Sequence, residues 1–342
     1  MRGTRLELRS ESLRKNARRA RALSPGAELF AMVKADGYGH GLRFTAESLS
    51  ADVDGFGVAL LEEALQLRGY GIDAPVLLLE GVFDAAELVE AAHAGCELIV
   101  HSEWQVVLLE RTSLPAPVRV WLKLDTGMHR LGVPLADVDA LVKRLRACAQ
   151  VSLAGMVSHF ACADMAEDSL SVLQLQRVHG VAARHGVPFS AANSAAIFRY
   201  PESAGSRVRP GIMLYGSSPF ADRTAGELGL AVTHRVSARI IAINDVPAGD
   251  SVGYGSSWQA KQESRIAVVA IGYGDGYPRH APSGTPVAVQ NADSCWRRAA
   301  LAGRVSMDMI TIDVTHLPLT RIGDNVELWG DQVSVDEVAQ HC

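Results

Sequence analysis

A lysine stands in an apolar run near the N-terminus, where a charged amine is out of place. Lys34 follows Ala31-Met32-Val33 and precedes a turn rich in glycine that contains Tyr38 and His40. Removing an amine from water lowers its pKa and makes it available as a nucleophile toward a carbonyl group. Taken alone, the segment is equally compatible with a lysine that extends its ammonium group from a strand end into solvent.

Further polar side chains stand at the ends of later apolar runs or close to them. They are Arg130, His159, Asn193, Ser194 and Arg209, and the backbone amides of Gly211 and Ile212 follow Arg209 in a loop that could bind a phosphate group. Singly, each has an ordinary explanation, such as a surface cation for Arg130, a core histidine for His159 and a helix N-cap for Ser194. Together with Lys34, they predict an anion-binding pocket that carries an amine.

The elements that must position these groups alternate along the first two thirds of the chain. Eight short apolar runs are separated by stretches with apolar residues at three- and four-residue intervals, such as 136–149 and 170–185. This alternation predicts a (β/α)8 barrel, with an open doubly wound sheet as the competing topology. The predicted strands are 28–35, 55–60, 75–81, 98–102, 118–125, 153–160, 189–194 and 210–216.

The pattern changes near residue 231. Alternating apolar residues separated by Gly, Pro and Asp turns replace the helical periodicity, which predicts a second, mainly-β domain. We therefore expect a barrel domain over 1–229 and a β domain over 230–342. Ser334 and Glu337 have the spacing of a capping box and predict a short final helix.

Composition restricts the class of ligand. The 342-residue chain has a formal net charge of -5, which gives no overall attraction for nucleic acid or anionic lipid. Its five cysteines are scattered without a CxxC pair, so neither a metal site nor a dithiol is expected. The N-terminus lacks the apolar core of a signal peptide. These features predict a cytoplasmic protein with a small-molecule substrate.

Five segments that span nearly the whole chain resemble those of bacterial alanine racemases, in the same order. The segments are AMVKADGYGHG, KLDTGMHRLG, VRPGIMLYG, VGYGSSW and GRVSMDMITID. Members of this family depend on pyridoxal 5'-phosphate and combine a (β/α)8 barrel with a C-terminal β domain. The resemblance implies a homodimer with shared active sites that interconverts L- and D-alanine.

The resemblance also implies a role for individual residues. Lys34 would hold the cofactor and act as the base on the D-alanine side, and Tyr254 of the partner subunit would serve the L side. The cofactor's phosphate and ring would be bound by Tyr38, His159, Asn193, Ser194, Arg209, Gly211 and Ile212. Arg130, Met307 and Asp308 would bind the substrate, and Tyr273 and Arg279 would line the entrance. Lys123 matches a lysine that is carbamylated in some members and supports the arginine at position 130.

Other functions stay open at this level. A regulatory or carrier protein that binds pyridoxal phosphate can use the same barrel and lysine, although such barrel-only proteins lack a segment with Tyr254 and Met307. A racemase of another small amino acid, such as serine, is a further alternative. Family members usually continue with one more strand that bears a tyrosine, whereas this sequence ends at Cys342. Whether the D-alanine serves peptidoglycan synthesis or catabolism also stays open.

Overall fold

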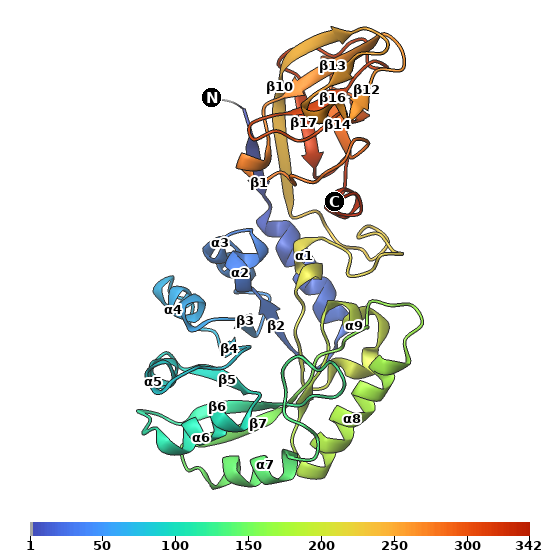
Figure 1. The fold of residues 1–342 in the computed structure, drawn as a ribbon. Helices are drawn as coiled ribbons and strands as arrows, with labels where there is room; N and C mark the ends of the chain where they lie inside the picture. Colours follow the sequence, from blue (N-terminus) through green and yellow to red (C-terminus); the bar gives the residue numbers. More distant parts are fainter. Residues whose placement is uncertain (1–2) are drawn as a thin grey trace. The chain divides into compact units, whose positions relative to one another are not determined.

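The computed structural model describes residues 3–342 and divides into two compact units. One unit comprises residues 10–231, and the other comprises the segment up to Arg9 together with residues 232–342. Figure 1 shows the first unit as parallel strands surrounded by helices and the second as an antiparallel sheet structure. The first described strand therefore belongs to the same unit as the C-terminal third of the chain.

The first unit is built on an eight-stranded parallel sheet in the order β8-β7-β6-β5-β4-β3-β2-β9. Its strands are β2 Glu28–Met32, β3 Gly55–Val58, β4 Val76–Leu78, β5 Cys96–Val100, β6 Val118–Lys123, β7 Val151–Val157, β8 Phe189–Ser190 and β9 Arg207–Val208. Backbone hydrogen bonds from Ser206 N to Phe189 O and from Arg209 N to Ala192 O, both 2.9 Å, join the two edges. The sheet is closed in this way, which confirms the barrel and excludes the open sheet.

Amphipathic helices cover the outside of this barrel. In α7, Val138, Leu141, Val142 and Leu145 are buried at the three- and four-residue spacing that the sequence shows. The principal helices are α1 Ser10–Leu23, α3 Leu42–Leu49, α4 Leu61–Gly69, α5 Ala85–His93, α6 Glu103–Arg111, α7 Val138–Ala147, α8 Ser169–His185 and α9 Ser194–Arg199. No helix among residues 3–342 is long and apolar enough to cross a membrane.

The eighth predicted strand, 210–216, is wrong. The strand is β9, Arg207–Val208, and the apolar run that follows it is a 3-10 helix over Ile212–Tyr215. Strand β9 was missed because Arg207 interrupts the apolar pattern that identified the other strands. Three of the four residues of the 3-10 helix are buried, so its composition is as apolar as that of a core strand.

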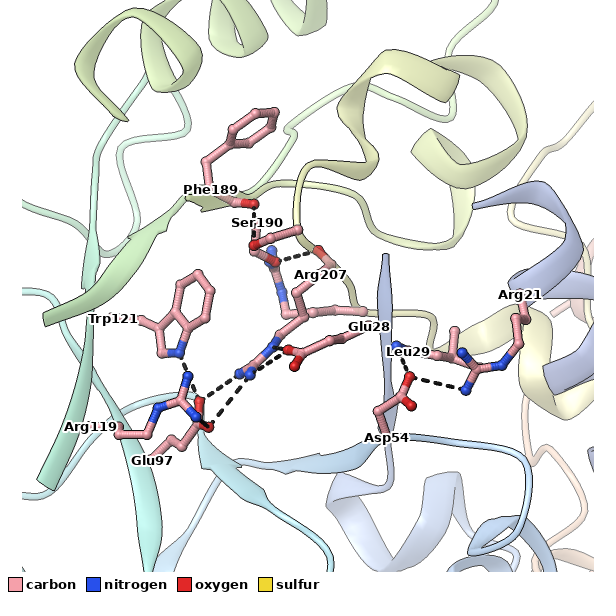
Figure 2. A network of polar contacts seen from close by, with 12 residues as sticks. Arg21, Glu28, Leu29, Asp54, Glu97, Arg119, Trp121, Phe189, Ser190 and Arg207 are labelled. Atoms are coloured by element: carbon pink, nitrogen blue, oxygen red, sulfur yellow. Dashed lines mark hydrogen bonds and ion pairs between the residues drawn. The ribbon is translucent and has the colours of Figure 1, made fainter. Parts of the chain in front are cut away.

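An ion cluster around the buried Arg207 guanidinium fills the end of the barrel where the strands begin (Figure 2). The Arg207 guanidinium donates to Glu97 at 2.6 Å and to Glu28 at 2.7 Å, and Trp121 Nε1 donates to Glu97 at 2.7 Å. The same guanidinium lies 3.5 Å from the centre of the Phe30 ring. Because these side chains occupy the barrel interior at this end, a ligand cavity must open at the carboxyl ends of the strands.

The second unit is a closed antiparallel sheet, as the alternating sequence pattern predicts. Its strands pair in the order β1-β10-β13-β16-β15-β14-β17, and β10 also pairs with β17. They are β1 Arg5–Leu8, β10 His234–Val246, β13 Ser264–Val269, β14 Pro286–Gln290, β15 Trp296–Leu301, β16 Ile310–Asp313 and β17 Asn325–Trp329. A separate small pair consists of β11 Ser251–Val252 and β12 Trp258–Gln259. The predicted final helix is α10, Val335–Ala339, and Ser334 caps it by accepting from Glu337 N at 3.0 Å.

Candidate active site

A cavity of about 580 Å³ lies at the carboxyl ends of the barrel strands. The structure brings to its wall every barrel residue that the sequence predicted as functional. These residues are Lys34, Tyr38, Lys123, Arg130, His159, Asn193, Ser194, Arg209, Gly211 and Ile212. A cavity of this size accommodates a cofactor together with a small substrate.

Lys34 lies just beyond its strand rather than within it. Strand β2 ends at Met32, and Lys34 begins a tight turn, α2 Lys34–Tyr38, in which Ala35, Asp36 and Gly37 have φ values of 53°, 52° and 62°. A left-handed conformation costs roughly 1–2 kcal/mol for each residue that is not glycine. The predicted strand 28–35 is three residues too long, and the turn must be held by other contacts.

Two carboxylates hold this turn. Asp36 Oδ1 accepts from Leu42 N at 2.7 Å, and Glu63 Oε1 from α4 accepts from Ala35 N at 2.7 Å. A Cβ atom at Gly37 would stand 2.6 Å from Thr45 Oγ1, so this position leaves no room for a side chain. The Lys34 side chain is thereby directed from a rigid turn into the cavity.

Tyr38, at the end of the turn, lies against Gly211 in the cavity wall. Its ring stacks on Tyr215 at 4.6 Å between ring centres, and the Tyr215 hydroxyl donates to Met32 O at 2.9 Å. A Cβ atom at Gly211 would come within 2.4 Å of Tyr38 Oη, so glycine at this position leaves room for the hydroxyl group. Burial raises the pKa of Tyr38, and its hydroxyl group stays a neutral donor.

Backbone amides gather around Ser194 on the same side of the cavity. Ser194 Oγ accepts from Gly211 N at 2.9 Å and from Met213 N at 3.3 Å. Asn193, rather than Ser194, is the N-cap of α9, because its side chain accepts from Ala196 N at 3.0 Å. A hydroxyl group and two backbone amides close together suit the oxygens of a phosphate group.

Arg209 is almost fully buried and contacts neutral acceptors. Its guanidinium donates to Ser158 O at 2.6 Å, to Ala191 O at 3.4 Å and to Ser190 Oγ. Burial, with a smaller effect from Arg207, lowers its pKa to about 10. Arg209 is therefore still a cation at neutral pH, and it can only donate hydrogen bonds.

Burial and the charge of Arg209 disfavour the protonated forms of His159 and Lys123. Burial, followed by the positive charge of Arg209, lowers the pKa of His159 to about 3. The same two causes, with a further effect of Arg130, lower the pKa of Lys123 to about 7. The imidazole is thus neutral at physiological pH, and the Lys123 amine is about half neutral.

Arg130 lies in a loop that an acidic residue organises. Asp125 Oδ1 accepts from Gly127 N at 3.0 Å and from His129 N at 3.1 Å, and His129 has a φ of 54°. The arginine itself is exposed on the cavity side of this loop. Its guanidinium is therefore accessible to a carboxylate that enters from solvent.

The predicted residues of the C-terminal third gather at a second hollow, of about 1040 Å³, within the β unit. Tyr254, Tyr273, Arg279 and Met307 line it, and Asp308 is the next residue after Met307. Tyr254 is 71% exposed, in the turn that follows β11. The Tyr273 turn is fixed to the Met307 segment, because Gly274 N donates to Met307 O at 2.8 Å.

Sequence reasoning missed several polar residues that shape the first cavity. Glu63, Gln174, Tyr215 and Thr126 form hydrogen bonds with its loops, and sequence reasoning gave none of them a role, although Thr126 and Tyr215 stand in the segments KLDTGMHRLG and VRPGIMLYG. Glu63 has one detectable signal, since an acid in the first turn of a helix is a common partner of loop amides. Gln174 has none, because one amide in an amphipathic helix resembles any surface position.

Comparisons with known proteins agree with this division of the chain. The family model "Alanine racemase, N-terminal domain" matches residues 8–219, and "Alanine racemase, C-terminal domain" matches residues 233–342. An alanine racemase of Alcanivorax borkumensis is 56% identical over 342 residues, which cover 100% of this chain and 94% of the relative.

Solved structures show the same similarity over the whole chain. The crystal structure of the biosynthetic alanine racemase of Pseudomonas aeruginosa matches with a TM-score of 0.96 at 45% identity and covers 100% of this chain and 94% of that one. The alanine racemase of Acinetobacter baumannii matches with a TM-score of 0.91 at 39% identity, with the same coverage.

Proposed function

The chain belongs to the alanine racemase family, and from that premise we propose that it interconverts L- and D-alanine with pyridoxal phosphate held by Lys34 in the barrel cavity. One observation carries the proposal. A lysine on a rigid turn, a phosphate-sized cluster of donors and a buried arginine all face the same cavity.

The donor set of the cavity fits this cofactor. Tyr38 Oη, Ser194 Oγ and the amides of Gly211 and Ile212 would hold the phosphate, with Asn193 fixing the start of α9 beside them. A Cβ atom at residue 211 would clash with Tyr38 Oη. Only glycine at this position therefore leaves space for phosphate oxygens beside the tyrosine hydroxyl group.

Arg209 and His159 would determine the electronic state of the cofactor ring. When bound, pyridoxal phosphate supplies an electron sink that acidifies the Cα proton of alanine. Arg209 would donate a hydrogen bond to the ring nitrogen without readily giving up a proton, since its pKa is about 10. Neutral His159 would pack beside the ring without adding charge.

Two bases on opposite faces of Cα are sufficient for racemisation. Lys34 Nζ would remove the proton from D-alanine or return it, and the Tyr254 hydroxyl would do the same for L-alanine. Arg130 would bind the substrate carboxylate. Met307 and Asp308 would restrict the pocket to a small side chain, and Tyr273 and Arg279 would line the entrance.

The second base implies an assembly. Lys34 belongs to the barrel unit and Tyr254 to the β unit. We propose a homodimer in which the β unit of one subunit completes the barrel cavity of the other, as the family resemblance implies. The product D-alanine would serve cytoplasmic peptidoglycan precursors or, in the reverse direction, D-alanine breakdown.

The test is exchange and racemisation in deuterium oxide. The purified protein loaded with pyridoxal phosphate should incorporate deuterium at Cα of alanine while optical rotation decays. Lys34→Ala should abolish removal of the Cα proton from D-alanine. Tyr254→Phe should reduce the rate of Cα proton removal from L-alanine by about 100-fold or more. Tyr70→Phe, at an exposed tyrosine outside both hollows, is the matched control.

The outcomes distinguish the alternatives. Cofactor binding without exchange of any amino acid would overturn the proposal in favour of a carrier or regulator. Faster exchange with serine than with alanine would assign a different substrate to the same mechanism. Equal loss on both faces in Tyr254→Phe would contradict the assignment of one base to each face.

A further inference from the structure

Gln174 is an uncharged residue in the middle of a polar network beside the cavity. It belongs to α8, and only 1% of its surface is exposed. Both the oxygen and the nitrogen of its carboxamide form hydrogen bonds. Oε1 accepts from Ala161 N at 3.0 Å, while Nε2 donates to His159 O at 3.0 Å and to Thr126 Oγ1 at 3.3 Å. One side chain thus joins the loop after β6 to the loop after β7.

The network continues to Arg209. Thr126 Oγ1 and Ser158 Oγ are joined by a 2.6 Å hydrogen bond, and Ser158 O accepts from the Arg209 guanidinium at 2.6 Å. Arg177, one helical turn after Gln174, donates to Thr126 O at 2.7 Å. From Gln174, the chain of contacts runs through Thr126 and Ser158, both neutral, to the buried cation Arg209.

We infer that Gln174 is a positioning residue, which sets the places of His159, the Arg130 loop and Arg209 relative to one another. The inference rests on the proposed function, because these three groups matter together only if they surround one ligand. Buried amides that lose a partner cost free energy, so the two loops keep this register while the carboxamide is present. Displacements of about 1 Å at a catalytic group can reduce rates by about 100-fold.

The chain contains a matched control for a merely structural role. Gln105, in α6, is 2% exposed and joins the two preceding loops in the same way. It accepts from His101 N at 2.8 Å and donates to Glu80 O at 3.1 Å. Its loops carry none of the residues proposed to act on cofactor or substrate.

The experiment compares Gln174→Met with Gln105→Met, because methionine preserves the length of glutamine without its polar atoms. Backbone hydrogen exchange in the protein without alanine should accelerate in segments 126–131 and 159–163 for Gln174→Met. For Gln105→Met it should accelerate around residues 80–84 and 101–103 instead. With cofactor bound, kcat/KM should fall by about 10- to 100-fold for Gln174→Met and by less than about threefold for Gln105→Met.

A second variant supplies a pH signature and guards against a folding defect. In Gln174→Glu, only the protonated carboxyl group can donate to His159 O, so its kcat/KM relative to wild type should rise as pH falls. The cofactor's visible absorption, followed over the same pH range, should shift in parallel. Because ionisation of a buried carboxyl group also destabilises the fold, the folded fraction is measured over the same pH range, and the trends are compared only where the variant stays folded.

The inference is overturned if the two methionine variants lose activity equally. It is also overturned if backbone hydrogen exchange in Gln174→Met accelerates in segments 126–131 and 159–163 while cofactor absorption and kcat/KM stay at wild-type values. A ratio for Gln174→Glu that does not change with pH also contradicts it. Failure of the proposed function is recognised separately, because then the wild-type protein with cofactor bound does not exchange the Cα proton of alanine.

Discussion

At the scale of single residues, burial divides the nitrogen groups of the barrel cavity into charged and neutral ones. Arg209 stays charged because its intrinsic pKa is so high that burial lowers it only to about 10. His159 and Lys123 experience the same burial and the repulsion of Arg209, and their pKa values fall to about 3 and about 7. A buried fixed cation, Arg209, therefore stands beside a neutral imidazole and an amine that titrates near neutral pH.

The proposed role of Arg209 predicts a change in the products. Arg209→Glu replaces a donor that keeps its proton with a carboxyl group that can protonate the ring nitrogen. Pyruvate formed by transamination should therefore increase by about 10-fold or more relative to racemisation, which corresponds to about 1.4 kcal/mol in relative barriers. The ratio is measured by assaying pyruvate and D-alanine in the same reaction. Unchanged partitioning in Arg209→Glu would refute this role.

Lys123 predicts a pH dependence of stability. Its pKa falls from 10.5 in the unfolded chain to about 7 in the fold, so the unfolded state binds more protons between these values. Its contribution to the free energy of unfolding therefore rises with pH across this range. Between pH 7 and pH 9.5, the free energy of unfolding of Lys123→Met should therefore rise by about 3 kcal/mol less than that of the wild-type protein.

Urea unfolding of the cofactor-free protein at both pH values, in buffer free of carbon dioxide, measures this difference. An identical pH slope in wild type and Lys123→Met would show that the amine titrates as it does in water. The same pair of proteins tests carbamylation, since labelled bicarbonate should give a carbamate signal by carbon NMR only when Lys123 is present.

At the scale of elements, the site depends on loops whose conformation the sequence pattern describes only in part. Strand positions near Met32, Lys123 and Val157 were predicted because continuous apolar runs identify buried parallel strands. The left-handed turn at Lys34 was not, because its stability comes from Glu63 and Asp36, which lie outside the run. The same limit explains β9, in which Arg207 is buried against Glu97 in a way that only the closed barrel reveals.

The phosphate-binding loop gives a prediction at this scale. Gly211→Ala would place a methyl group 2.4 Å from Tyr38 Oη, so either the tyrosine or the loop must move. Affinity for pyridoxal phosphate should fall by about 10-fold or more, since well-placed donors to a phosphate group contribute over 1 kcal/mol each. Titration of the cofactor-free protein by absorbance measures the dissociation constant.

Gly180→Ala is the control, because Gly180 lies within α8 and a Cβ atom there would meet nothing within 4 Å. This substitution should stabilise the helix by about 0.5–1 kcal/mol and leave cofactor affinity unchanged. Equal affinities in Gly211→Ala and wild type would remove Gly211 from the proposed phosphate site.

At the scale of the whole molecule, the proposal that each active site takes its two bases from different subunits can be tested by mixing two inactive variants. Lys34→Ala and Tyr254→Phe homodimers should each be nearly inactive in racemisation. If the two variants exchange subunits, each heterodimer has one site with both defects and one site with none. Random exchange should therefore restore about a quarter of the wild-type activity. If both bases of a site came from one chain, mixing would give no gain.

The pairing of β1 with β10 links the protein's architecture to the order in which it is synthesised. Leu8 pairs with His234 and Arg5 with Ser237, so this strand is synthesised before the barrel and must wait for a partner that is synthesised after it. The barrel, over residues 10–231, can complete its own contacts in the meantime. During translation, the growing chain therefore carries an exposed strand ahead of a folded domain, and such an unpaired edge is a natural binding site for a chaperone.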